Sequence, residues 1–160
     1  MEYYDRNTVW GFSQRTLKNL AHLNAARRDG ADVHVVTHLV TSLLGLIVFP
    51  YQEIKDSNYA EFQSIQLAQL EAEGWPAWRV DIGNSKNFED HIRHLRNAIS
   101  HRRLYFSSDS RELANVEIRF RDASSTKSPW NWGAIIGAEA LQDFVLRFAT
   151  YLQQWERDYS

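Results

Sequence analysis

One short segment of the chain gathers the residue types that bind phosphate and move protons. Between Asn87 and Arg103 the sequence carries imidazole, guanidinium and carboxamide side chains. Imidazole transfers protons near neutral pH, and guanidinium binds phosphate oxygens as a fork. A carboxamide can bond to a phosphate, a ribose hydroxyl or a base edge. The segment therefore predicts a phosphate-handling surface; the alternative is a solvent-exposed helix face that happens to be rich in histidine.

The spacing of these residues is helical, and we expect a helix from Asn87 to about Arg103. At 100° per residue, the apolar side chains fall on one narrow stripe that predicts the buried face. This stripe consists of Phe88, Ile92, Leu95 and Ile99. A second stripe, centred on the opposite side, consists of Asp90, His94, Asn97 and His101. Arg93 and Arg96 lie between the two stripes.

The end of this helix carries a motif that resembles the signature of a known superfamily. Arg96, Asn97 and His101 match the R-x4-6-H pattern of HEPN domains (higher eukaryotes and prokaryotes nucleotide-binding domains), in which a polar residue, often Asn, follows the arginine. The segment Leu95–His101 is similar to the common LRNAxxH form, and Leu43–Pro50 resembles a run seen in some HEPN proteins. The resemblance covers residues 13–155 and implies a small α-helical bundle.

The resemblance also implies an endoribonuclease that needs no metal ion or other cofactor. HEPN domains typically form dimers in which the motif helices face each other, so the polar stripe would face a second copy of the chain. The ribose 2′-OH would attack the adjacent phosphate and leave a 2′,3′-cyclic phosphate and a 5′-OH. His101 would act as general acid or base, Arg96 would stabilise the charge on the phosphoryl oxygens, and Asn97 would orient the phosphate or His101.

Four further basic residues could extend this site along an RNA backbone. They are Arg93, His94, Arg102 and Arg103. Each also has an ordinary explanation, because exposed helices carry solvated charges and because cations complement the dipole at a helix C-terminus. Arg119 and Arg121 have the same two possible roles, either contact with RNA or exposure on a solvated face.

Other functions fit the residues less well. His34 and His38 have the i, i+4 spacing of metal ligands, but no Glu follows His34 as in H-E-x-x-H, so a buried or capping role is expected. A weaker metal candidate is the group Glu89, Asp90, His91 and His94. Two other classes stay open: a non-catalytic HEPN-fold module that binds nucleotide, RNA or a partner protein, and a helical protein whose histidine-rich face only dimerises. A toxin or defence role, with an antitoxin or regulatory partner, follows from the resemblance alone.

The composition is that of an ordinary globular domain. The chain has 160 residues, of which 44% are hydrophobic and 24% charged, and we expect one HEPN-like domain over 1–160 with its core at about 13–156. The absence of cysteine excludes disulfides, cysteine nucleophiles and thiolate metal sites. The net charge of −2 excludes a generally basic nucleic-acid coat. Positive charge nevertheless concentrates along the sequence, with seven Arg against three acidic residues from His91 to Arg121; starting at Phe88 reduces the excess from +4 to +2.

Hydrophobic periodicity predicts a mainly α fold, a single-domain bundle of about five helices with one β-hairpin before the last helix. The helices are expected at Ser13–Arg28, Asp32–Phe49, Tyr59–Glu73, Asn87–Arg103 and Gly137–Glu156, with Ser13 as an N-cap and with Gly30, Pro50 and Gly74 as stops. The hairpin is expected at about 114–136, where Val116, Ile118 and Phe120 alternate with polar residues. Gly45, inside the second helix, predicts the close approach of another helix.

The aromatic residues and the chain's apolar run give two further expectations. The tryptophans are expected to pack, with Trp75 and Trp78 in a loop as the best candidates for base stacking. Leu39–Pro50 is the most apolar stretch, too short to span a bilayer, so it is expected to be a buried helix. Because Met1–Arg6 lacks the pattern of a signal peptide, a cytoplasmic protein is expected.

Overall fold

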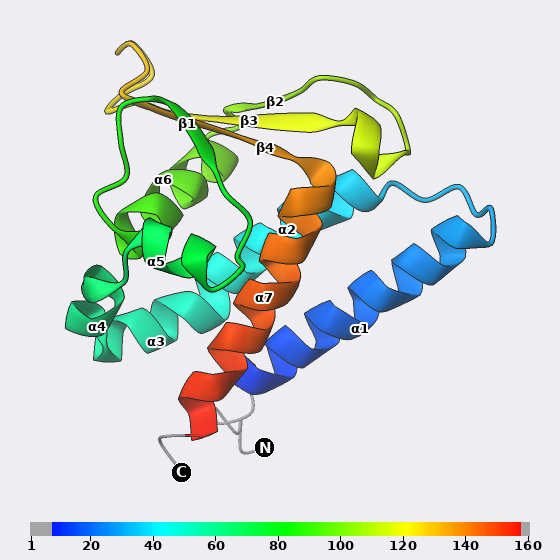
Figure 1. Ribbon diagram of the computed structural model, residues 1–160, viewed down its shortest axis with the longest axis horizontal. Helices are drawn as coiled ribbons and strands as arrows, with labels where there is room; N and C mark the ends of the chain where they lie inside the picture. Colours follow the sequence, from blue (N-terminus) through cyan, green and yellow to red (C-terminus); the bar gives the residue numbers. More distant parts are fainter. Residues whose placement is uncertain (1–7, 158–160) are drawn as a thin grey trace. The chain divides into compact units, whose positions relative to one another are not determined.

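The computed structural model describes residues 8–157, whose helices and strands are labelled in Figure 1. These residues fall into two compact units. One unit comprises the described residues up to Asn58 together with those from Phe144 onward, and the other comprises residues 59–143. The segment Met1–Arg6, on which the signal-peptide expectation rests, lies outside the described residues. The single HEPN-like domain over 1–160 stays a prediction.

The first unit is helical. It contains α1 (Thr8–Arg28), α2 (Val35–Leu46), the π-helix η2 (Ile47–Tyr51), α3 (Gln52–Ser57) and the part of α7 (Ala138–Arg157) that follows Asp143. Helix α1 packs against α2 and η2, and the ring of Tyr51 lies 5.8 Å from that of Phe148 on α7. The fully buried core includes Leu20, Leu39, Leu43, Leu46, Phe148 and Leu152.

Helix α1 ends where expected but begins earlier. Gly30 adopts a φ of +84°, the left-handed conformation that favours glycine after a helix. The predicted N-cap was wrong, because Ser13 lies inside α1 and is fully buried there. Gly45 confirms the expected close approach, since a Cβ at this position would come within 2.7 Å of Cζ of Phe12 on α1.

The predicted stop at Pro50 was also wrong. The backbone stays helical from Val35 to Ser57, and Pro50 lies inside the π-helical turn. Proline has no N–H to donate, and its ring clashes with the carbonyl four residues earlier in an α-helix. The wider i→i+5 turn relieves this conflict without ending the helix. Periodicity alone does not reveal such a turn.

This continuous run bears on the membrane question. Among the described residues, the helical run Val35–Asp56 is long and apolar enough to cross a membrane, with a mean hydropathy of 1.5. The expectation that the apolar stretch is too short was therefore wrong. More than half of its most apolar part, 56%, is buried inside the protein, which is how the core helix of a globular protein behaves. The cytoplasmic location stays a prediction.

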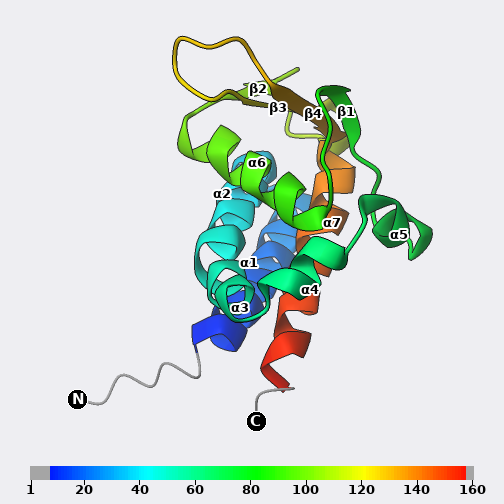
Figure 2. The ribbon, with the colours of Figure 1, turned by 90° about the vertical axis from the view of Figure 1, so that its left-hand side faces the viewer.

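The second unit combines a small sheet with three α-helices, a 3₁₀ helix and the start of α7. Its elements are α4 (Tyr59–Ser64), α5 (Leu67–Ala72), β1 (Arg79–Ile82), α6 (Phe88–Ser100), β2 (Leu104–Phe106), the 3₁₀ helix η3 (Leu113–Asn115), β3 (Glu117–Asp122), β4 (Trp132–Gly137) and the start of α7. The four strands pair antiparallel in the order β1-β4-β3-β2. Helix α6 packs on β3, as Figure 2 shows.

The mainly α class and the hairpin are confirmed, with two corrections. The hairpin β3–β4 gains β1 and β2 as outer strands, which are too short to show alternation in the sequence. The predicted helix Tyr59–Glu73 is two short helices, because the chain leaves the helical path after Ser64. The carbonyl of Ile65 instead accepts the backbone N–H of Phe88, at 2.9 Å, and so joins this break to the start of α6.

Candidate functional site

Helix α6 carries the residues of the expected site, and its buried face is the one predicted. Phe88, Ile92, Leu95 and Ile99 are all buried. Asn87 caps the helix, since its Oδ1 accepts the backbone N–H of Asp90 at 2.9 Å. The helix begins at Phe88 and ends at Ser100, so Arg102 and Arg103 follow it instead of forming its last turn.

One carboxylate on β3 holds three of the predicted site residues. Asp122 is only 3% exposed. Its Oδ2 lies 2.8 Å from Nδ1 of His94 and accepts a hydrogen bond from Nδ2 of Asn97 at 3.0 Å. Its Oδ1 accepts a hydrogen bond from Nη1 of Arg103 at 3.3 Å. This group, Asp122 with His94, Asn97 and Arg103, is called the Asp122 cluster below.

Asp122 was missed by the sequence analysis, although the sequence contains a signal for it. It continues the alternation of Ile118 and Phe120, both fully buried, and so occupies an inward-facing position of the strand. A carboxylate at such a position needs charged or hydrogen-bonding partners. The helix that packs on β3 supplies them.

The ring of His94 is held in position from two sides. Its ring stacks on that of Trp132, with 4.8 Å between centroids and 7° between planes. Its Nε2 lies 3.3 Å from Nη2 of Arg93. When the ring is neutral, Nε2 accepts from this guanidinium, which can only donate, and the Nδ1 proton then points to Asp122. The expected polar stripe is therefore divided, with His94 and Asn97 turned toward the sheet.

Asp90 balances the charge of Arg93 at the start of α6. The guanidinium of Arg93 donates to the Asp90 carboxylate, and the backbone N–H of Lys86 donates to its other oxygen at 3.0 Å. Burial alone would raise the pKa of the Asp90 carboxyl. The Lys86 N–H and the positive charges of Arg93 and His94 outweigh burial and hold this pKa below its usual value.

His91, one turn before His94, belongs to the core. It is fully buried, and its ring makes edge contacts with Trp78 at 4.8 Å and with Trp132 at 5.4 Å. Its Nδ1 lies 2.9 Å from Oγ of Ser85, which also accepts the indole N–H of Trp132. Burial, reinforced by the charge of His94, lowers the pKa of His91 to about 3. The imidazole is thus neutral at physiological pH.

The two tryptophans favoured for base stacking pack inside the second unit. Trp78 is buried, with its ring 5.6 Å from Phe120, and Trp75 makes an edge contact with Phe88 at 6.0 Å. Trp130, which follows the β3 strand in the hairpin loop, is instead 42% exposed. The guanidinium carbon of Arg103 lies 5.6 Å from its ring centroid, so one face of Trp130 is occupied by a cation.

Arg96, His101 and Arg102 differ from the Asp122 cluster. Arg96 is half-buried, and His101 and Arg102 are exposed. Their side chains have no hydrogen bond or ion pair with any other residue in the part of the chain that the structure describes. These three side chains are therefore available to a ligand.

The backbone after α6 is strained at Arg102. The N–H of Arg103 donates to the carbonyl of Ala98 at 2.8 Å, and the N–H of Arg102 donates to that of Ile99 at 3.1 Å. This pattern is a Schellman motif, which places Arg102 in the left-handed region with a φ of +58°. Glycine is the usual residue there, and a side chain costs about 1–2 kcal/mol.

The positive charge predicted around the motif is largely neutralised in space. Four of the arginines pair with carboxylates: Arg93 with Asp90, Arg103 with Asp122, Arg121 with Asp81, and Arg119 with Glu117. Three of these acids lie outside the sequence window in which the charge was counted. Arg96 and Arg102 retain unpaired charges among the described residues, so the basic site is narrower than the sequence suggests.

The described residues give no support to a metal site. They contain no group of three or more His, Asp or Glu side chains placed to hold a metal ion. The candidate set Glu89, Asp90, His91 and His94 forms no such group, because Asp90 binds Arg93 while His91 faces the core.

These observations define a class of protein: a mainly α chain with a small antiparallel sheet and an Arg-Asn-His motif on a late helix. The chain belongs to the HEPN family described as HEPN pEK499 p136, whose model matches residues 1–158. The comparisons with curated proteins and with solved structures gave no match.

Proposed function

We propose that this protein is a metal-independent endoribonuclease of the HEPN type. The observation that carries the proposal is that one residue of the motif is held in place by the protein, whereas the other two are free to contact a ligand. Asp122 fixes Asn97 from the inner side, whereas Arg96 and His101 have no protein partner among the described residues. A site for phosphate chemistry needs a cation and an imidazole that can reach the substrate, on a helix whose position is fixed by other contacts. Membership of the HEPN family supports RNA or nucleotide as the ligand.

The reaction needs one group to accept a proton and one to donate it. The 2′-oxygen of the substrate attacks the adjacent phosphorus, the bond from phosphorus to the 5′-oxygen breaks, and the products are a 2′,3′-cyclic phosphate and a 5′-OH. His101 removes the 2′-OH proton or protonates the leaving 5′-oxygen. Arg96 stabilises the negative charge that develops on the phosphoryl oxygens. A homodimer would bring two copies of both residues to one cleft.

The remaining predicted residues serve binding and orientation. Asn97 uses one amide N–H on Asp122 and keeps its other N–H and its carbonyl for His101 or the substrate. Arg102 is the free cation nearest in sequence to His101 and contacts an RNA phosphate. Arg93, His94 and Arg103 have partners within the chain, so we assign them to the support of the site and to weaker RNA contacts at its edge.

The proposal is tested by incubating labelled RNA with the protein in excess chelator. We expect cyclic phosphate ends, no cleavage of a substrate whose 2′-OH is replaced by hydrogen, and about a 10²–10⁴-fold loss of rate in His101→Ala and Arg96→Ala. His22→Ala, an exposed histidine of α1, is the matched control and should cleave like the parent protein. If His101→Ala cleaves as fast as this control, the proposal is wrong.

A second candidate is a non-catalytic module that binds RNA or nucleotide. It is favoured by His101, which has no partner in the described part of the chain to orient its ring for proton transfer. RNA that binds but stays whole in the same assay would establish this function. A toxin or defence role, an antitoxin partner and a cytoplasmic location belong to the proposal at the level of the family, and sedimentation of the purified protein tests the homodimer.

A further inference from the structure

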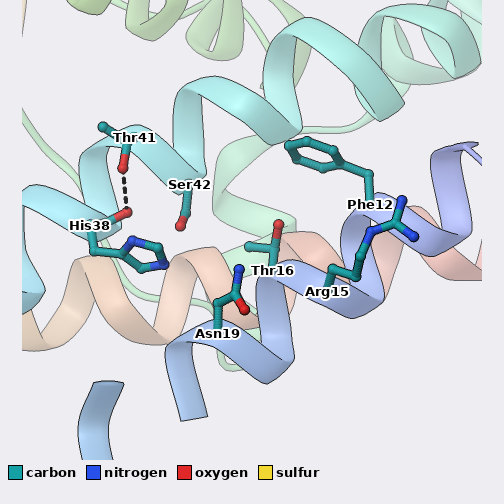
Figure 3. Close-up of a pocket in the computed structure, with 7 residues that line it drawn as sticks. All are labelled: Phe12, Arg15, Thr16, Asn19, His38, Thr41 and Ser42. Carbon is teal, nitrogen blue, oxygen red and sulfur yellow. Dashed lines mark hydrogen bonds between the residues drawn. The ribbon is translucent and has the colours of Figure 1, made fainter. Parts of the chain in front are cut away.

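The first unit contains a cavity that the proposed RNA site does not use. It lies between α1 and α2, has a volume of about 300 Å³, and appears in close-up in Figure 3. That volume is at the lower end of the range of small-molecule sites. Its lining includes Phe12, Arg15, Thr16 and Asn19 from α1, with His38 and Ser42 from α2. None of these residues belongs to the motif on α6.

Several polar groups converge on this space. In Figure 3 the side chains of Thr16, Asn19, His38 and Ser42 turn toward the gap between the two helices. The Nε2 atom of His38 is buried and has no hydrogen-bond partner among the described residues. Buried ring nitrogens normally have one. The Thr41 hydroxyl is already used, since its single proton is shared between the backbone carbonyls of Thr37 and His38, at 3.2 and 3.0 Å.

The charge of the lining points to an anion. Arg15 contributes a permanent positive charge, and none of the described residues that line the cavity is Asp or Glu. Burial lowers the pKa of His38, so its neutral ring offers either a donor or an acceptor, depending on the tautomer. A ligand with several acceptor oxygens satisfies Arg15 and the hydroxyl and amide groups together, whereas a cationic ligand would find no opposite charge among these lining residues.

One end of the cavity has an aromatic wall, the ring of Phe12. Phe12 lies against α2 at Gly45, where a Cβ would come within 2.7 Å of its ring, and its centroid is 5.4 Å from that of Phe49. In Figure 3 the guanidinium of Arg15 lies on the same side of the cavity as Phe12. A cation beside an aromatic ring suits a ligand that carries an oxyanion on a flat, apolar group.

We propose that this cavity binds a small organic oxyanion, either a phosphate monoester or a carboxylate. Arg15 holds the oxyanion, Phe12 contacts the apolar group, and Asn19, His38 and Ser42 bond to the polar remainder. This site stands apart from the proposed RNA chemistry, so a failure of one does not bear on the other.

The test is an NMR titration of the isotopically labelled full chain at constant ionic strength. The probes are phenyl phosphate, benzoate and, as a neutral match, phenol. We expect saturable shifts in α1 and α2 with at least one oxyanion and at least tenfold weaker binding of phenol. The probe that binds more tightly shows whether the natural ligand is a phosphate monoester or a carboxylate. Saturation by neither oxyanion below tens of millimolar, or equal binding of phenol, would overturn the proposal.

Two variants of α1 separate a built site from general charge attraction. Arg15→Gln should weaken oxyanion binding at least tenfold, because a charged hydrogen bond is lost. Lys18→Gln removes the same charge from an exposed position that does not line the cavity and should change binding less than twofold. If both variants weaken oxyanion binding equally, the binding depends only on long-range attraction to positive charge, and the proposal is overturned. Both variants should retain the RNA cleavage of the parent protein.

Discussion

The Asp122 carboxylate lies 2.8 Å from Nδ1 of His94, although the two residues are 28 positions apart in the sequence. This contact joins the end of β3 to the middle of α6. The other hydrogen bonds to the carboxylate, from Asn97, from Arg103 and from the backbone N–H of Ala123, compensate its removal from water. We therefore expect the orientation of the motif helix on the sheet to depend on this buried charge.

Asp122→Asn tests this dependence. The amide keeps the shape of the side chain but leaves Arg103 with an uncompensated buried charge and presents an N–H to one of the existing donors. Breaking a buried charge pair typically costs about 3–5 kcal/mol, so we expect a loss of that order in the free energy of unfolding in urea. Asp109→Asn, at an exposed position, should change it by less than about 0.5 kcal/mol. Similar values for the two variants would show that Asp122 does not organise the helix.

The contrast between α6 and Asp122 illustrates what the sequence could predict. The buried stripe Phe88, Ile92, Leu95 and Ile99 is confirmed because helical periodicity is a local property. The partner of His94 is not local, since it depends on how α6 packs on β3. For the same reason the count of charges along the sequence overestimated the basic surface: Arg121 pairs with Asp81, 40 positions away.

The fold shows the same limit at two places. At Pro50 the sequence predicts the end of a helix, but a π-helical turn continues it. Across Ser64 the apolar pattern predicts one uninterrupted helix, but the chain forms two. Whether a helix continues depends on which partner its backbone groups find. The carbonyl of Ile65, for example, accepts the N–H of Phe88, which is distant in the sequence. The strands β1 and β2 escaped prediction because they have only four and three residues.

Stability should fall in mild acid because of His91. An unfolded chain binds a proton at this imidazole below pH 6.5, whereas the folded protein resists protonation until about pH 3. The unfolded state therefore holds more protons between these values, and stability is lost as pH falls through this window, at up to about 1.4 kcal/mol per pH unit. Urea unfolding at pH 6.5, 5.5 and 4.5 measures the slope.

A variant assigns this slope to the residue. His91→Phe fills the space between Trp78 and Trp132 without a titrating group, so the slope from pH 6.5 to pH 4.5 should flatten even if the variant is less stable overall. His22→Gln, at an exposed position, should keep the slope of the parent protein. An unchanged slope in His91→Phe would mean that other groups cause the acid sensitivity.

Two glycines of the first unit should respond in opposite directions to alanine. Gly45→Ala brings a Cβ within 2.7 Å of the Phe12 ring, and overpacking of about 1–3 kcal/mol outweighs the gain of about 1 kcal/mol in helix propensity. In Gly11→Ala the nearest atoms, at 3.3 Å, belong to the flexible guanidinium of Arg15, so the gain should prevail. Thermal unfolding should rank Gly11→Ala above the parent protein and Gly45→Ala below it; the reverse order would contradict the close packing of α1 on α2.

We expect Arg102 to lower the stability of the protein while it contributes to RNA cleavage. Arg102→Gly relieves the left-handed backbone after α6, where φ is +58°, so we expect the free energy of unfolding to rise by about 1 kcal/mol. The same change removes a free cation beside His101, and RNA cleavage should fall at least tenfold, as expected for a lost phosphate contact. Arg102→Ala loses the cation but keeps most of the strain, so its activity should fall without the gain in stability. Arg102→Lys should retain the parent's stability and part of its activity, because it keeps the charge without the fork. Cleavage by Arg102→Gly at the parental rate would leave the strained arginine without a function in this site.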